Sequence, residues 1–167
     1  MMGDRIESLK DALEVFIDNL PDDSYFNIIS FGSEYEYYSS ESIKNTASAR
    51  TEAKSWTKSI DADFGGTEIL EPVLSLDTLE LIENYPRTVV ILTDGAVYNE
   101  DQVIFQVHEL SDRMQVCGVG IGYGVSDYLL RNIGIAGKCT TIFVTDEDNL
   151  AEKAMHIINA ATSHYIQ

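Results

Sequence analysis

The sequence predicts an α/β fold with a doubly wound, mainly parallel sheet and helices on both faces. Strand-like runs of branched and aromatic residues alternate with amphipathic helical stripes. One run, TVVILT at residues 88–93, is uninterrupted, which is typical of a parallel strand covered on both faces. The length of 167 residues fits one domain, residues 1–167, that can bury a single core.

The first half of the chain is expected to begin with a helix. Apolar residues at steps of three and four predict this helix over residues 4–20, and Pro21 ends it. Residues 25–31, YFNIISF, predict a buried strand, and residues 35–38 a short edge strand paired antiparallel with it. A polar, weakly amphipathic helix is expected over residues 42–60.

The second half repeats strand and helix in turn. Residues 61–67, DADFGGT, predict a loop, and residues 68–79 a helix with Pro72 in its first turns. The remaining elements are expected as strands at 88–93, 114–121 and 140–144 and as helices at 100–110, 126–136 and 149–161. We expect residues 25–31 and these three strands to form one mainly parallel sheet.

The charge balance restricts the partners. The chain has 28 acidic and 11 basic residues, a formal net charge of -17. Such a surface repels phosphate backbones and anionic lipids, so we expect no nucleic-acid and no membrane partner. It attracts cations and basic partners, although solubility alone also explains the charge.

The cysteines say little about the compartment, and the start of the chain favours an intracellular protein. Cys117 lies in an apolar run and is expected to be a small core residue, Cys139 opens another strand-like run, and two cysteines form no disulfide framework. The polar start MMGDRIESLK contains no secretory signal. These features favour the cytoplasm but leave the location unknown.

The polar residues after two apolar segments point to a ligand site. Asp94 and Gly95 follow the run at 88–93, and Gly66 and Thr67 end the loop before the next helix. Ligands bind at the carboxyl ends of parallel strands, and a carboxylate beside a hydroxyl suits Mg²⁺ or Mn²⁺. Two plainer interpretations remain open: Asp94-Gly95 as a turn and Thr67 as a helix N-cap.

The sequence contains no catalytic or nucleotide-binding motif. The alternating glycines at 118–124 do not fit G-x-G-x-x-G, and neither a G-x-x-x-x-G-K-[ST] loop nor a G-x-S-x-G turn occurs. His108, His156 and His164 lie on predicted helices, away from the two loops. We therefore expect no catalytic residues, no organic cofactor and no enzymatic activity.

Four segments together resemble the von Willebrand factor A family, most closely the branch of inter-alpha-trypsin inhibitor heavy chains and vault-type proteins. They are MMGDRIESLKDALEVFIDNLPDDSYFNIISFGS, DADFGGTEILEPVLS, VVILTDGAVYNED and GVGIGYGVSDYLLRNIGIAGK. The resemblance implies a Rossmann-like sheet and a metal-ion-dependent adhesion site (MIDAS). By position, Thr67 and Asp94 match two of the metal ligands of that site.

The chain departs from the family at its start. In the family, the segment similar to MMGDRI follows a first strand and an Asp-x-Ser-x-Ser motif that supplies further ligands. Here the sequence begins at that point, so we expect a domain truncated at its N-terminus that lacks this strand. A divalent ion needs about six oxygens, so Mg²⁺ or Mn²⁺ should bind weakly or not at all unless Asp61, Asp63 or Glu68 compensates.

The resemblance implies a non-enzymatic protein-interaction or adhesion module. In the family an acidic group of the partner protein completes the coordination of the metal. The alternative is a structural or assembly domain that works without metal through its exposed sheet. An absent central strand would leave two inner edges unpaired, which predicts self-association, for example as a homodimer.

Overall fold

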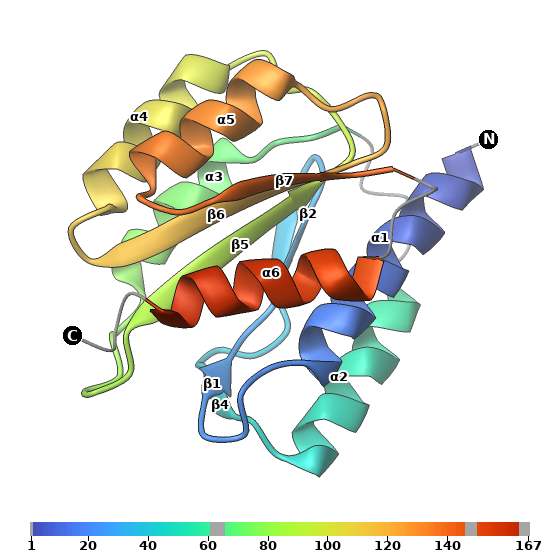
Figure 1. Cartoon of the computed structure of the whole chain (residues 1–167), viewed down its shortest axis with the longest axis vertical. Helices are drawn as coiled ribbons and strands as arrows, with labels where there is room; N and C mark the ends of the chain where they lie inside the picture. Colours follow the sequence, from blue (N-terminus) through green and yellow to red (C-terminus); the bar gives the residue numbers. More distant parts are fainter. Residues whose placement is uncertain (1, 61–65, 146–149, 164–167) are drawn as a thin grey trace.

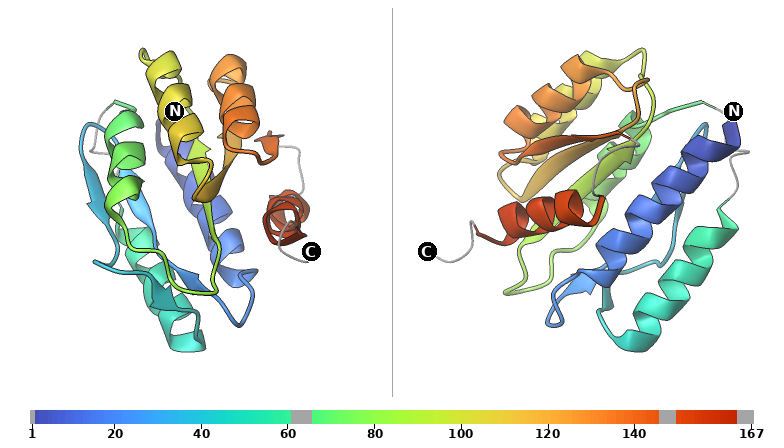
Figure 2. Two further views of the ribbon diagram at one scale, coloured as in Figure 1. Left: turned by 90° about the vertical axis from the view of Figure 1, so that its left-hand side faces the viewer. Right: turned by 45° about the vertical axis from the view of Figure 1, so that its right-hand side comes forward.

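The computed structural model describes residues 2–60, 66–145 and 150–163 and confirms the α/β class. Three parallel strands form a sheet in the order β5-β6-β7. Their bounds are β5 (Arg87–Thr93), β6 (Met114–Ile121) and β7 (Thr141–Val144). Helices cover both faces of this sheet, as expected for a doubly wound fold (Figures 1 and 2). In the described part of the chain, no helix is long and apolar enough to cross a membrane.

The two faces of the sheet bury separate apolar clusters. One face packs against three helices, α3 (Leu70–Ser75), α4 (Glu100–Leu110) and α5 (Asp127–Ala136). The other packs against α1 (Met2–Asp18) and α6 (Leu150–Ser163). Residues of β5 alternate between the clusters, since Val89 and Ile91 contact the first and Val90 and Leu92 the second. This alternation explains why the run at 88–93 is apolar without interruption.

Helix α2 (Ala47–Ser59) lies beside α1, and the two share a third apolar cluster with Phe26 and Ile28 (Figure 2). The expected helix at 42–60 therefore begins later than predicted, because Ile43–Lys44 form the strand β4. Thr46 starts α2 as its N-cap, where its Oγ1 accepts a hydrogen bond from the Ala49 backbone N–H at 3.1 Å. The expected helix at 68–79 also differs from the prediction, because it is divided into α3 and a 3₁₀ turn, η1 (Leu76–Thr78).

The run at 25–31 is two short strands, and the prediction of one continuous strand is wrong. β1 (Tyr25–Phe26) pairs antiparallel with β4, and β2 (Ile29–Phe31) pairs antiparallel with β3 (Tyr35–Tyr37), the expected edge strand. Asn27 lies between β1 and β2. Its side chain accepts from the Ser39 N–H at 3.1 Å and donates to the Ser39 carbonyl at 2.7 Å. A side chain thus takes the place of a backbone pairing at the break.

The prediction that residues 25–31 join the parallel sheet is also wrong. β2 hydrogen-bonds to β3, and within the described residues no strand pairs with the edge of β5 that faces away from β6. Ile29 and Phe31 of β2 nevertheless pack against the same apolar cluster as Ile91 of β5. The two strands therefore contribute to one core without sharing hydrogen bonds.

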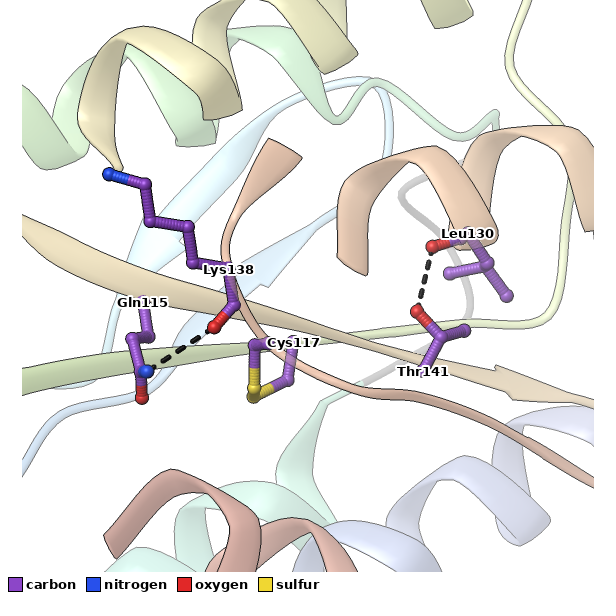
Figure 3. The surroundings of a disulfide bond; sticks show 6 residues. Gln115, Cys117, Leu130, Lys138 and Thr141 are labelled. Atoms are coloured by element: carbon purple, nitrogen blue, oxygen red, sulfur yellow. Dashed lines mark hydrogen bonds between the residues drawn. A yellow bond between two sulfur atoms is a disulfide. The ribbon is translucent and has the colours of Figure 1, made fainter. Parts of the chain in front are cut away.

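Cys117 and Cys139 form a disulfide, although two cysteines indicated no disulfide framework in the sequence (Figure 3). Their Cα atoms are 5.0 Å apart, and the bond joins β6 to the segment before β7. That segment is also held to β6 by the Gln115 side-chain amide, which donates to the Lys138 carbonyl at 3.2 Å. At Gly137 a Cβ atom would lie 2.3 Å from the Val116 carbonyl oxygen, so only glycine permits this close approach.

Candidate functional site

Three loops meet at the carboxyl ends of β2 and β5. The loop before α3 is joined to the end of β2 by the Glu68 backbone N–H, which donates to the Gly32 carbonyl at 2.8 Å. Gly66 adopts a φ of +91°, a conformation that favours glycine, and a Cβ there would lie 3.2 Å from Ser33 Oγ. The loop with Thr67 is therefore held directly against the residues that follow β2.

The same loop contacts the residues that follow β5. A Cβ atom on Gly95 would lie 3.0 Å from Thr67 Oγ1, so the threonine hydroxyl packs against this glycine. Asp94 precedes Gly95 and is half-buried. The structure thus brings the loops of Thr67 and Asp94 together at one end of the sheet. That both side chains bind one ion stays a prediction.

The two plainer interpretations fare differently. Thr67 is not the N-cap of α3, because Ile69 occupies that position and no side-chain bond caps the helix. Asp94-Gly95 does lie in a tight bend after β5, where the Gly95 N–H donates to Thr93 Oγ1 at 3.3 Å. A bend is therefore present, and it places the half-buried Asp94 at the end of the strand.

The donor chemistry fits a hard divalent cation, but the donor number does not. A carboxylate and a hydroxyl are oxygen ligands of the kind that Mg²⁺ and Mn²⁺ prefer. Among the described residues, no group of three His, Cys, Asp or Glu side chains could hold a metal ion. Thr67 and Asp94 would supply two of about six oxygens. Asp61 and Asp63, the expected compensating carboxylates, lie outside the described residues.

Ser33 is a site residue that the sequence analysis did not single out. Ser33 comes just after the end of β2, separated from it by Gly32, and Asp94 comes directly after the end of β5. This shared position after a strand is the sequence feature that could have identified Ser33. Together with Glu68, Glu34 and Glu71 it lines a cavity of about 620 Å³ beside the Thr67 loop. Glu68, the third expected compensating residue, therefore lies next to the candidate site.

The two histidines that the structure describes take no part in this site. His108 on α4 and His156 on α6 are exposed helix residues, as predicted, and His164 lies outside the described residues. The three converging loops thus present hydroxyl and carboxylate oxygens.

Comparison with known proteins shows which family the chain matches. A family model described as "von Willebrand factor type A domain" matches residues 1–141. The von Willebrand factor A domain-containing protein 5A of Rattus norvegicus is 37% identical over 157 residues, which cover 94% of this chain and 19% of that protein. The chain therefore spans about a fifth of the length of this relative. The narrower resemblance to the inter-alpha-trypsin inhibitor and vault branch stays a prediction.

Two solved structures have a similar fold, and the second of them holds a metal ion. A von Willebrand factor type A structure from Catenulispora acidiphila has a TM-score of 0.80 at 20% identity, covering 93% of this chain and 38% of that one. Proximal thread matrix protein 1 from the mussel byssus, with zinc in its MIDAS motif, has a TM-score of 0.70 at 19% identity, covering 90% of this chain and 39% of that one.

Proposed function

Because this chain belongs to the von Willebrand factor type A domain family, we propose that it is a non-enzymatic protein-interaction module that holds Mg²⁺ or Mn²⁺ at Thr67 and Asp94. A partner protein would contribute an acidic group that completes the coordination of the ion. One observation carries the proposal: Thr67 Oγ1 lies 3.0 Å from the position of a Cβ on Gly95, the residue after Asp94. Zinc in the MIDAS motif of the mussel protein gives further support.

The chemistry of the two residues determines how the ion would be held. The Asp94 carboxylate supplies the negative charge, and among the described residues no basic side chain forms a salt bridge with it. Thr67 supplies a neutral oxygen from the adjoining loop. The remaining positions belong to water and to the acidic group of the partner, so the ion should bind weakly until the partner is present.

Isothermal calorimetry with Mg²⁺ and Mn²⁺ tests the site. We expect a dissociation constant weaker than about 10 μM, since two protein ligands form an incomplete cation site. Asp94→Asn should abolish the signal, whereas Glu109→Gln, the same change at an exposed residue of α4, should leave it unchanged. Gly95→Ala should also weaken binding, because its Cβ would crowd Thr67 Oγ1 at 3.0 Å. Binding that survives Asp94→Asn would refute the assignment.

A second candidate function is assembly through the edges of the sheet. β5 carries hydrogen bonds to β6, and in the described ranges no strand pairs with its other edge. Three of its apolar side chains, Val89, Val90 and Leu92, are only half-buried. An apolar strand with an unpaired edge is a template for another strand. A second copy of the chain, exchanging an element with the first, could cover it.

Size-exclusion chromatography with light scattering tests the assembly. A dimer should elute with about twice the monomer mass of 18.6 kDa, and the β5 amides on the covered edge should become protected from hydrogen exchange as concentration rises. Addition of EDTA should change neither result, because no ion takes part. A mass of 18.6 kDa at all accessible concentrations would exclude self-association.

A further inference from the structure

Large aromatic side chains gather on the segments that follow β5 and β6. Tyr98, between β5 and α4, is 85% exposed. Tyr128, in the first turn of α5, is 55% exposed. Exposed aromatics of this size are unusual when they lie together, and they commonly mark a binding surface. Neither of the functions proposed above uses them.

Tyr98 and Tyr128 line one concave surface between the first turns of α4 and α5. The cavity has a volume of about 750 Å³ and is lined by residues 97–102 and Tyr128. Its two helices are joined at this point, because the Tyr128 hydroxyl donates to Asp101 Oδ1 at 2.8 Å. The contact orients the Tyr128 ring beside a carboxylate. We call Tyr98, Glu100, Asp101 and Tyr128 the tyrosine-acid surface.

The tyrosine-acid surface carries negative charge, and Arg131, the basic residue of α5 nearest in sequence to Tyr128, is paired with Asp127 at 2.7 Å. Residues 94–103 contain Asp94, Glu100 and Asp101 and no lysine or arginine. In the described part of the chain, neither Glu100 nor Asp101 forms a salt bridge. The pKa of Tyr128 is raised, mainly by its hydrogen bond to Asp101 and also by the charges of Asp101 and Glu100. The local field therefore favours a cation.

Helix stability alone does not explain this arrangement. Acidic residues in the first turn of α4 interact favourably with the helix dipole, which accounts for Glu100 and Asp101 as charges. It does not account for two exposed tyrosines lining the same cavity. Aromatic faces beside carboxylates are, in contrast, the groups that bind a guanidinium, which stacks on the ring and pairs with the carboxylate.

We propose that the tyrosine-acid surface binds an arginine-bearing segment of a partner protein. The guanidinium would stack on Tyr98 or Tyr128 and form hydrogen bonds to the carboxylates of Glu100 and Asp101. This interaction needs no metal ion, and neither Thr67 nor Asp94 lines the cavity. The net charge of -17 attracts such a segment over the whole surface, and the tyrosines give the attraction a fixed location.

Fluorescence anisotropy with a labelled peptide of alternating arginine and glycine, measured in EDTA, tests the proposal. Tyr98→Ser should weaken binding about fivefold through loss of the cation–π contact. Glu100→Gln should weaken it about threefold and reduce its salt dependence. Tyr123→Ser and Glu109→Gln are the matched controls: Tyr123 is 83% exposed but does not line the cavity, and Glu109 is an exposed acid later in α4. Both controls should bind like the unmodified chain.

Each contrary result overturns the proposal in a recognisable way. Equal losses in the variants and in their controls would mean that the peptide follows only the overall charge. Equal binding of a peptide with glutamate in place of arginine would exclude guanidinium recognition. Binding that EDTA abolishes would assign the peptide to a metal site. In contrast, peptide binding that Asp94→Asn leaves unchanged supports the tyrosine-acid surface. Circular dichroism of every variant confirms that it is folded.

Discussion

β5 and β6 are neighbouring strands with similarly apolar sequences and different surroundings. β6 pairs with β5 on one edge and β7 on the other, and its residues are buried except Gln115. β5 pairs with β6 alone among the described residues, and most of its side chains are only half-buried. An apolar sequence therefore does not by itself bury a strand. Burial also requires a partner on each edge and a helix over each face.

The largest expected effect lies on the β6 side of this comparison, at the disulfide. Cys117 and Cys139 are 22 residues apart, and closing a loop of this length stabilises a fold by about 3 kcal/mol. Reduction should lower the free energy of unfolding by that amount, measured by urea denaturation with and without dithiothreitol. A variant with alanine at both positions should not respond to the reductant. An unmodified chain whose urea midpoint ignores the reductant would contradict the prediction.

A matched pair of substitutions measures the difference between the strands directly. Val119 in β6 is fully buried and Val90 in β5 is half-buried, and both contribute to the same cluster. Val119→Ala should cost about 2 to 3 kcal/mol, since it removes two methyl groups and leaves a cavity. Val90→Ala should cost about 1 kcal/mol. Equal losses in chemical denaturation would show that β5 is as well covered as β6.

Hydrophobic pattern predicted the elements from residue 88 onward because local and tertiary preferences agree there. The strands at 88–93 and 114–121 and the helix at 100–110 match β5, β6 and α4 closely. The first half differs because pairing depends on distant residues. Asn27 breaks the run at 25–31 by bonding to Ser39, and Ile43 enters a strand with Phe26 instead of a helix. The spacing of apolar residues along the chain cannot predict such contacts between residues far apart in the sequence.

Similar reasons limit what could be predicted of the site and the disulfide. Asp94 and Thr67 could be singled out because they follow apolar segments at the expected end of the sheet. Ser33 has the same relation to β2, but a serine after Gly32 resembles an ordinary turn in sequence. The bond between Cys117 and Cys139 depends on the register of β6 with the segment before β7.

The smallest expected effect concerns an exposed ion pair near the start of β6. Lys138 Nζ donates to Asp112 Oδ1 at 2.9 Å. This hydrogen bond and the lysine charge hold the pKa of Asp112 below its ordinary value. A lowered carboxyl pKa stabilises the fold at pH values above the ordinary one, and the contribution disappears as the pH falls through the lowered pKa. Because both side chains are largely exposed, solvent screens the pair.

Lys138→Asn tests this contribution without disturbing the backbone, because Lys138 has a φ of +55° and asparagine tolerates that conformation. The variant should return the pKa of Asp112 toward its ordinary value, followed by NMR titration of its carboxyl carbon. At neutral pH its urea midpoint should shift less than that of Val90→Ala. A shift as large as that of Val119→Ala would mean that charge near the start of β6 stabilises the strand as much as burial does. The difference between β5 and β6 could then no longer be attributed to pairing and packing alone.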